Sequence, residues 1–291
     1  MRNRFTILPV LLLSLLCSCG SGDNSGESPV KSYYPKAKGT FRVMSYNVGA
    51  MHKFIPDLRD NVDMIAAMIR ETQPDVVGLS ELDSCNQRHN VNQVAMLTEA
   101  IGKWSWYFGK ALDYRGGSYG NGIIVPSKTK VVNQYSHRYP NPTLEEENPR
   151  ETRSVIVLET DKYILLATHL GGGTYNLPDG GKANYMLLQI EDLNKLALEK
   201  YKGSRVPVFL CGDMNATPGS EPIQALEQYW EVISNQDEMT TVNTHRTIDF
   251  IFHLKDSAPV EVIGAHTLLK FYDGDSEKAS DHFPIYADVK F

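Results

Sequence analysis

One short stretch of the chain ends an apolar run with two polar side chains of complementary chemistry. Residues 206–210 are apolar and β-forming, with a proline near the start, and Gly212, Asp213 and Asn215 follow. At a strand end, residues two apart point the same way, so Asp213 and Asn215 would face one site. A carboxylate accepts protons and binds cations, whereas an amide donates hydrogen bonds without titrating. The pair suits activation of a water beside a bound anion, although taken alone it also fits an ordinary turn.

A second acid, Asp249, stands inside an apolar segment. Its neighbours Ile248 and Phe250 indicate a buried strand, and burying a carboxylate without a partner is costly. An imidazole is its natural partner, because a carboxylate fixes the histidine tautomer and favours the charged ring. His169 and His282 both lie near predicted strand ends. The residues alone leave both histidines open as the partner of Asp249.

Five further polar residues lie at or near predicted strand ends. Each alone is most simply a solvated loop or strand-end residue. As a set with the two histidines they describe hard-cation and phosphate chemistry, because Mg²⁺ prefers a few carboxylates, other oxygen ligands and water. The sequence has no cysteine–histidine cluster of the zinc type and no glycine-rich nucleotide motif. The additional candidates are Asn47, Glu81, Asn121, Arg153 and Asp281.

Many short strands and a few helices must position these residues. Apolar patterning predicts helices across 62–69, at 93–101 and at 185–201, with a short helix from Glu221. The first strand, helix and next strand suggest neighbouring strands joined by a crossover helix. The whole pattern indicates a mixed α/β or α+β sandwich rather than a purely parallel sheet. The predicted strands are 41–48, 76–79, 104–108, 121–125, 154–159, 163–168, 206–210, 247–252, 260–265 and a last strand ending at 291.

A glycine-rich segment, residues 171–181, directly follows His169. Glycine and proline punctuate it, which is typical of a long loop. We expect this loop to border the site and to help choose the substrate.

The first residues have the features of an export signal. Arg2 and Arg4 precede an apolar run at 7–16, which is too short for the roughly 20 residues of a membrane-spanning helix. The run ends in a segment that resembles a bacterial lipobox, with Cys19 as the lipidated residue. We therefore predict a signal peptide at 1–18, a flexible polar tether at 19–39 and one domain at 40–291. The predicted location is exported and membrane-anchored, on the periplasmic or cell-surface side; an ordinary secretory signal is the alternative.

The charge of the chain argues against general binding to nucleic acid. The formal net charge is −6, and removal of residues 1–18 leaves 27 basic against 35 acidic residues, or −8. Duplex binding depends on lysine and arginine that neutralise phosphates, so a nucleic-acid partner is possible only through a local basic pocket. We expect a monomer. Cys85 and Cys211 could form a disulfide or remain free, and the sequence does not decide between these.

Seven short motifs occur in the order found in one large superfamily. They resemble the endonuclease/exonuclease/phosphatase superfamily, which includes DNase I, exonuclease III-like repair nucleases, neutral sphingomyelinases and inositol polyphosphate 5-phosphatases. The resemblance spans roughly residues 40–291. The motifs are the segments 45–47, 79–83, 119–123, 168–170, 212–215, 248–252 and 280–285.

The resemblance implies a DNase I-like fold and a metal site. The fold would be a four-layered α/β sandwich with two central mixed β-sheets and one site at their upper edge. The metal would be Mg²⁺, with Mn²⁺ or Ca²⁺ as alternatives, bound by Glu81 with help from Asn47 and with Asp281 next to it. The chain departs from the repair nucleases at Gly49, where they carry an acid, which argues against metal coordination like theirs.

The resemblance also assigns catalytic roles by position. Asp213 would orient and deprotonate the attacking water, and Asn215 would position the scissile phosphate. His282, paired with Asp249, would stabilise charge on the phosphoryl oxygens. His169 would contact the phosphate or assist the leaving group.

The predicted function is hydrolysis of a phosphate monoester or diester by in-line attack of an Asp-activated water. Asn121 and Arg153 are the candidate substrate-binding residues. Low basicity and the predicted export favour a small or lipid-linked substrate. An exported DNase-like endonuclease is one alternative, and a catalytically silent binding lipoprotein is another; the filled polar positions argue against the latter.

Overall fold

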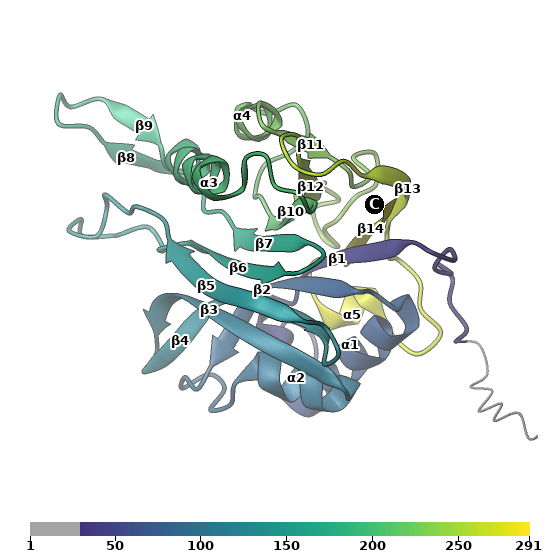
Figure 1. The fold of residues 1–291 in the computed structure, drawn as a ribbon. Helices are drawn as coiled ribbons and strands as arrows, with labels where there is room; N and C mark the ends of the chain where they lie inside the picture. The colour runs from purple at the N-terminus through teal and green to yellow at the C-terminus, as the bar shows by residue number, and fades with distance from the viewer. Residues whose placement is uncertain (1–29) are drawn as a thin grey trace, which may run out of the picture. The chain divides into compact units, whose positions relative to one another are not determined.

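The computed structural model describes residues 30–291, which form two β-sheets packed face to face with helices on both outer faces (Figure 1). This is the predicted four-layered α/β sandwich with two central mixed sheets. Among the described residues, no helix is long and apolar enough to cross a membrane. The predicted signal peptide and Cys19 lie outside the described residues.

The first sheet contains the predicted strand–helix–strand unit. β1 (Phe41–Asn47) and β2 (Val76–Ser84) are parallel neighbours joined by α1 (Leu58–Thr72), and the other pairs in this sheet are antiparallel. α2 (Gln93–Ile101) packs beside α1 against the same outer core. The strand order is β13 (Glu261–Thr267), β14 (Ile285–Lys290), β1, β2, β4 (Gly117–Pro126) and β3 (Trp104–Tyr114).

The second sheet repeats this plan. β7 (Ile164–His169) and β10 (Val208–Asp213) are parallel neighbours joined by α3 (Tyr185–Tyr201), the predicted amphipathic helix. α4 (Glu221–Glu227) covers the same face. The strand order is β11 (Trp230–Val232), β12 (Asp249–Leu254), β10, β7, β6 (Ser154–Thr160) and β5 (Val131–Arg138).

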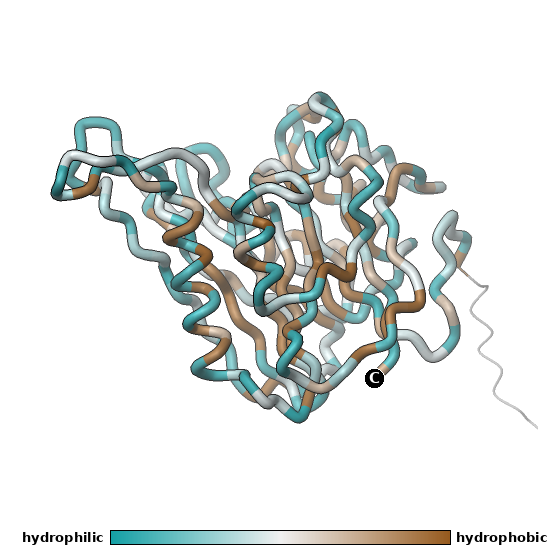
Figure 2. The backbone as a smooth tube through the Cα atoms, turned by 90° about the horizontal axis from the view of Figure 1, so that it is seen from above, coloured by the Kyte–Doolittle hydropathy of each residue, from teal (hydrophilic) through white to brown (hydrophobic). Residues whose placement is uncertain are grey.

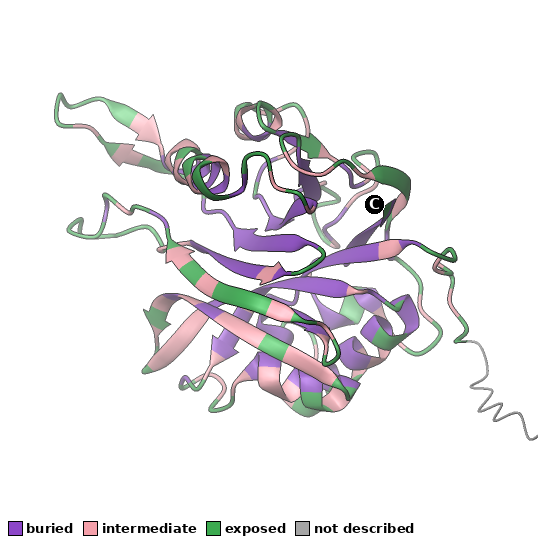
Figure 3. Cartoon of the chain, in the orientation of Figure 1, coloured by how far each residue is buried: buried purple, intermediate pink, exposed green. Residues whose placement is uncertain are grey.

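Several short elements complete the fold, and some differ from the prediction. The segment 115–120, expected as a loop, is only a tight turn at Arg115 and Gly116, both with positive φ, before β4 begins. β5 was not predicted, because it is an edge strand with many exposed residues (Figure 3). The remaining elements are η1 (Gly49–Met51), the hairpin β8 (Thr174–Asn176) and β9 (Lys182–Asn184), and α5 (Ser276–Ala279).

Side-chain alternation builds three apolar layers. In β10, Phe209 and Cys211 face the other sheet, whereas Leu210 faces α3. β7 and β10, at the centre of the second sheet, are therefore buried on both faces. Apolar segments gather in the interior of the molecule, and polar segments lie at its periphery (Figure 2). Cys211 is buried and Cys85 exposed, and both are free, so they do not form a disulfide.

The folded unit begins earlier than predicted. It starts at Lys31 rather than at residue 40. Tyr33 stacks on Tyr272 with ring centroids 4.3 Å apart, and the Tyr34 hydroxyl accepts a hydrogen bond of 3.0 Å from the Leu269 amide. Tyr33 and Tyr34 thus join part of the segment predicted as tether, residues 31–39, to the folded unit.

Candidate active site

Three predicted site residues lie side by side because of strand register. β10 lies between β7 and β12, and Asp213 pairs with His169 on one side and with Asp249 on the other. Each residue continues the face of its strand that points between the sheets. All three are almost completely buried. The sheet therefore assembles an acid, an imidazole and a second acid in one row at its edge.

Glu81 reaches this row through an irregularity in β2. The pairing of β2 with β4 shifts by one residue between Leu79 and Leu82, and Glu81 has a φ of 60°. Strict alternation would place Glu81 on the outer face with Val77 and Leu79. A β-bulge re-aims a side chain in this way, and here it turns the carboxylate toward the site.

Asn47 connects the two catalytic carboxylates. Its Nδ2 donates to Glu81 Oε1 at 2.9 Å and to Asp213 Oδ2 at 3.1 Å. Its Oδ1 accepts from the Gly49 amide at 3.0 Å, which fixes the orientation of the group. Asn47 thus offers its N–H groups to Glu81 and Asp213 and keeps its Oδ1 on the Gly49 amide; its help to Glu81 in binding a metal stays a prediction.

The environment of Asp213 makes it a proton acceptor suited to neutral pH. Burial, followed by the nearby Asp249 charge, raises the pKa of Asp213 to about 7, while the cationic His282 opposes this rise. The backbone N–H of Asn215 donates a hydrogen bond of 2.8 Å to Asp213 Oδ1, so that Oδ2 is the oxygen that faces the other site residues. A base with a pKa near the working pH is effective in general base catalysis.

His282 is held as a cation by Asp249, the pair that the resemblance implied; the apolar context of Asp249 alone had left His169 open as well. Its Nδ1 lies 2.8 Å from Asp249 Oδ2, and its Nε2 lies 3.7 Å from Asp213 Oδ2. Burial alone would lower the pKa of His282, but Asp249, and then Asp213 and Asp281, raise it to about 10. His282 therefore presents a charged N–H donor to the site at neutral pH.

His169 is kept neutral by its surroundings. Its Nδ1 lies 2.9 Å from Arg153 Nη1, and its Nε2 lies 3.0 Å from Asn215 Nδ2 and 3.5 Å from Asp213 Oδ2. Burial, then the charges of Arg153 and His282, hold the pKa of His169 well below its usual range. With donors on both ring nitrogens, an imidazolium would have little hydrogen-bonding benefit.

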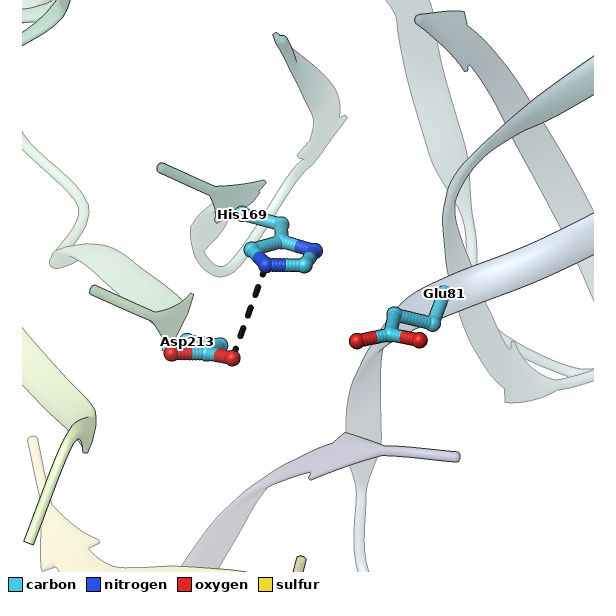
Figure 4. Close-up of side chains that lie close together, drawn as sticks. All are labelled: Glu81, His169 and Asp213. Carbon is cyan, nitrogen blue, oxygen red and sulfur yellow. Dashed lines mark ion pairs between the residues drawn. The ribbon is translucent and has the colours of Figure 1, made fainter. Parts of the chain in front are cut away.

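The carboxylates offer a place for a divalent cation. Single ligand atoms of Glu81, His169 and Asp213 lie within 4.8 Å of one another, and Figure 4 shows the Glu81 carboxylate facing the other two side chains. Two carboxylates with room for other oxygen ligands fit Mg²⁺ or a similar hard cation. A second group, Asp213, Asp249 and His282, is equally close. In this group, however, His282 Nδ1 and the Asp249 carboxylate are already paired with each other.

Asp281 lies beside the site but faces a lysine. Its Oδ2 is 2.8 Å from Lys53 Nζ, and neither of the two cation-holding groups among the described residues includes it. Its Oδ1 lies 3.1 Å from where a Cβ on Gly49 would stand. Gly49 also has a φ of 53°, so a side chain at this position would be both tightly packed and strained.

The two predicted substrate-binding residues differ in placement. Arg153 lines a cleft of about 370 Å³ that opens from the site, and its Nη2 forms an ion pair of 2.8 Å with Glu151. Asn121 is buried, and its amide donates to the Ser154 carbonyl at 2.8 Å, which links the two sheets. Asn121 does not line the cleft, so the structure gives it a sheet-linking contact rather than a substrate-facing one.

The cleft also contains residues that the sequence did not single out. Arg88, Tyr114, Tyr119 and Glu151 line it together with the predicted site residues. They lie in the loop after β2, at the β3–β4 turn and before β6, where apolar periodicity gives no signal. The sequence holds one signal for this side of the cleft: an acidic and a basic residue five positions apart, Asp83 and Arg88, where a strand ends.

The glycine-rich loop at 171–181 lies close to the cleft. It contains β8 and leads into β9, and this hairpin projects beyond α3 at the upper left of Figure 1. Gly171 and Gly172 line a hollow of about 270 Å³ that shares Glu151 and Arg153 with the larger cleft. The start of the loop therefore adjoins the cleft, whereas the hairpin projects away from it; the part of the loop in choosing the substrate stays a prediction.

Comparison with known proteins identifies the family. The sequence profile described as Endonuclease/Exonuclease/phosphatase family matches residues 44–282, which include the described site residues. The chain belongs to this family. Its members, among them phosphatases and nucleases, are metal-dependent phosphoesterases. No curated protein sequence matches the chain.

Solved structures support the fold assignment. An endonuclease/exonuclease/phosphatase from Beutenbergia cavernae is 22% identical with a TM-score of 0.64, covering 87% of this chain and 72% of the other. A Bacteroides thetaiotaomicron mannosyl-6-phosphatase is 17% identical with a TM-score of 0.64, covering 86% and 100%. The human Nocturnin catalytic domain with bound sulfate is 20% identical with a TM-score of 0.62, covering 87% and 94%. At these identities the likeness shows the fold.

Proposed function

We propose that this family member is a Mg²⁺-dependent phosphoesterase that hydrolyses a small or lipid-linked phosphate ester. The observation that carries this proposal is the convergence of Glu81, Asp213 and the His282–Asp249 pair on one cleft. Glu81 would hold the divalent cation beside Asp213, and the cation would supply positive charge to polarise the phosphate. A catalytically silent binding protein would have no need for this combination of a base and a cationic donor.

The residues of the chain then act on the water and the ester. Asp213 Oδ2 takes a proton from the attacking water as the water oxygen bonds to phosphorus. His282 donates to a phosphoryl oxygen, where negative charge grows, and His169 with Asn215 orients the phosphate. The ester P–O bond breaks opposite the attack, and the alcohol leaves with a proton from solvent. The products are the alcohol and the phosphate.

The choice of a small substrate rests on charge and on family members. The net charge of −6 disfavours a polyanionic duplex. One similar structure is described as a mannosyl-6-phosphatase, which acts on a phosphorylated sugar. An exported nuclease is retained as an outcome of the test.

The test is hydrolysis by the full chain in detergent, with Mg²⁺ and then with EDTA. The panel is bis-p-nitrophenyl phosphate, p-nitrophenyl phosphate, sphingomyelin and plasmid DNA. We expect Mg²⁺-dependent cleavage of a small ester, lost in EDTA and in Asp213→Asn. Cleavage of plasmid DNA alone, with a steep loss of rate at higher salt, would favour the nuclease instead. A folded protein that cleaves nothing and binds no Mg²⁺ would contradict the proposal.

We also propose that the chain is exported and anchored through a lipid on Cys19. The support is the sequence: a short apolar run followed by a segment that resembles a lipobox. Expression in a bacterial host with labelled palmitate should place the label in the membrane fraction. Cys19→Ala should lose the label and Cys17→Ala should keep it. Label retained in Cys19→Ala would contradict the assignment.

A further inference from the structure

One wall of the cleft is built around an arginine that is held rigidly. Arg88 Nε and Nη2 donate to the two carboxylate oxygens of the buried Asp83 at 2.7 and 2.8 Å. The guanidinium carbon lies 4.9 Å from the centre of the Tyr114 ring and 6.0 Å from that of Tyr119. A two-point ion pair combined with aromatic stacking fixes the plane of the guanidinium. Arg88 therefore presents its remaining Nη1 in a set orientation.

This wall carries hydrogen-bonding groups that the protein does not use. Across the described part of the chain, Arg88 Nη1 and the hydroxyls of Tyr114 and Tyr119 have no hydrogen-bond partner, although all three residues line the cleft. Glu81 and Arg153 line the same cleft as Tyr119. The residues that carry these free groups thus line the same cleft as Asp213, Asn215 and His282, toward the end where β3 turns into β4.

Both arginines of the cleft are paired with acids, which distinguishes this wall from a site for a second phosphate. Asp83 neutralises Arg88, and Glu151 neutralises Arg153 at 2.8 Å. No lysine lines the cleft within residues 30–291. A subsite for another phosphate needs cations without such partners. Fixed donors and acceptors of balanced charge instead match a neutral group with several hydroxyls.

We propose that Arg88, Tyr114 and Tyr119 bind the alcohol part of the substrate, and that this alcohol is a sugar or cyclic polyol. The inference rests on the proposed phosphoesterase function and names its substrate class. The cleft of about 370 Å³ has room for one such ring beside the phosphate. Each free group would pair with a hydroxyl of the substrate. A phosphate ester whose alcohol part carries no further hydroxyl would leave these groups unpaired and bind less well.

The experiment compares phosphates that differ in their hydroxyls. The full chain hydrolyses a chromogenic reporter, whichever p-nitrophenyl ester of the panel it cleaves, and four phosphates are tested as inhibitors. These are glucose 6-phosphate, mannose 6-phosphate, myo-inositol 1-phosphate and n-hexyl phosphate. All carry one phosphate on a six-carbon alcohol, and n-hexyl phosphate has no hydroxyl. We expect at least one polyol phosphate to have an inhibition constant at least about tenfold below that of n-hexyl phosphate. Equal constants for all four would overturn the proposal.

Variants then locate the preference on the wall. Tyr114→Phe and Tyr119→Phe each remove one hydroxyl and keep the ring, and Arg88→Lys removes the fork. Each should reduce the ratio between n-hexyl and polyol inhibition constants by roughly three- to tenfold. Arg115→Lys is the matched control, because Arg115 also lies over Tyr114, at 5.2 Å, but does not line the cleft. It should leave the ratio unchanged.

The two levels of the proposal fail in different ways. If the reporter is not hydrolysed at all, the proposed function fails, and calorimetric binding of the same four phosphates still tests the wall. If the reporter is hydrolysed but the ratio is unchanged in both tyrosine variants, the wall assignment is wrong. Because Arg88→Lys could disturb the buried Asp83, thermal melting is recorded for each variant, and the tyrosine variants decide.

Discussion

At the scale of single residues, Asp213 is placed where function and stability conflict. Its folded pKa is about 7 against an ordinary value of 3.8, chiefly because burial disfavours the charged form. The folded state therefore binds the proton more tightly than the unfolded state. Stability is lost as pH rises from about 4 to 7, and the full cost is present above pH 7. The protein tolerates this cost because a base with such a pKa is useful.

Asp213→Asn should separate these two effects. We expect turnover to fall by about 10²- to 10⁴-fold, since the proton acceptor is gone. The same variant should be more stable than the parent at pH 8, by on the order of 1 kcal/mol, because no charge is buried. Urea unfolding in EDTA at pH 8 and pH 4 measures this. The gain should shrink toward zero at pH 4, and a loss of stability at pH 8 would contradict the electrostatic account.

His282 should show the opposite pH dependence. Its folded pKa is about 10 against an ordinary 6.5, since Asp249 and Asp213 outweigh burial. Its contribution to stability is fully present below pH 6.5, declines as pH rises, and is gone above about pH 10. The difference in unfolding free energy between the parent and His282→Gln should therefore be larger at pH 6 than at pH 10. A difference that does not change with pH would show that His282 is not held as a cation.

The sequence predicted those site residues whose direction follows from strand alternation. His169, Asp213 and Asp249 each continue a regular strand face, so their convergence needs only the strand order. The orientation of Asn47 depends on a hydrogen bond from a backbone amide with positive φ, at Gly49. Arg88 depends on loop packing against a neighbouring turn. Neither leaves a periodic signal in the sequence.

At the scale of elements, the two sheets pack tightly where Gly78 of β2 faces Cys211 of β10. A Cβ on Gly78 would lie 2.3 Å from Cys211 Sγ and 3.1 Å from the Ala167 Cβ. Gly78 is three residues before Glu81, and Cys211 is two before Asp213. Any separation of the sheets at this point would therefore change the distance between the two carboxylates.

Gly78→Ala should test this close contact. We expect a loss of unfolding free energy of ~1–3 kcal/mol from overpacking, together with lower turnover. Cys211→Ala removes the nearest atom, so Gly78→Ala with Cys211→Ala should lose less than the sum of the two single variants. A double-mutant cycle by urea unfolding measures the coupling. Simple additivity would mean that the sheets adjust without reference to this contact.

The order of elements was predictable, but their lengths and irregularities were not. The two units of parallel strands joined by α1 and α3 follow from apolar periodicity. The bulge at Glu81 has no such signature, because its neighbours in β2 are ordinary strand residues. The resemblance to the family supplied Glu81, and the local pattern alone would have turned it to the outer face.

At the scale of the whole molecule, the segment after residue 30 is part of the folded unit and connects to its interior. Arg42 is completely buried and forms a two-point ion pair with Asp288, at 2.7 Å for both contacts. Its Nη1 donates to the Tyr34 carbonyl at 2.8 Å and to the Thr72 carbonyl at 2.7 Å. Loss of residues 31–39 would expose this arginine and remove one of its acceptors, besides the stacking of Tyr33.

Two truncations should therefore behave differently. A chain that begins at Lys31 should unfold at the same urea concentration as the full chain in detergent. A chain that begins at Thr40 should be less stable by roughly 2–4 kcal/mol, from lost aromatic packing and a buried donor left without a partner. Tyr33→Ala in the chain that begins at Lys31 should reproduce only that part of the stability loss which comes from stacking on Tyr272. Equal stability of the two truncated chains would show that residues 31–39 do not stabilise the fold and belong to the tether.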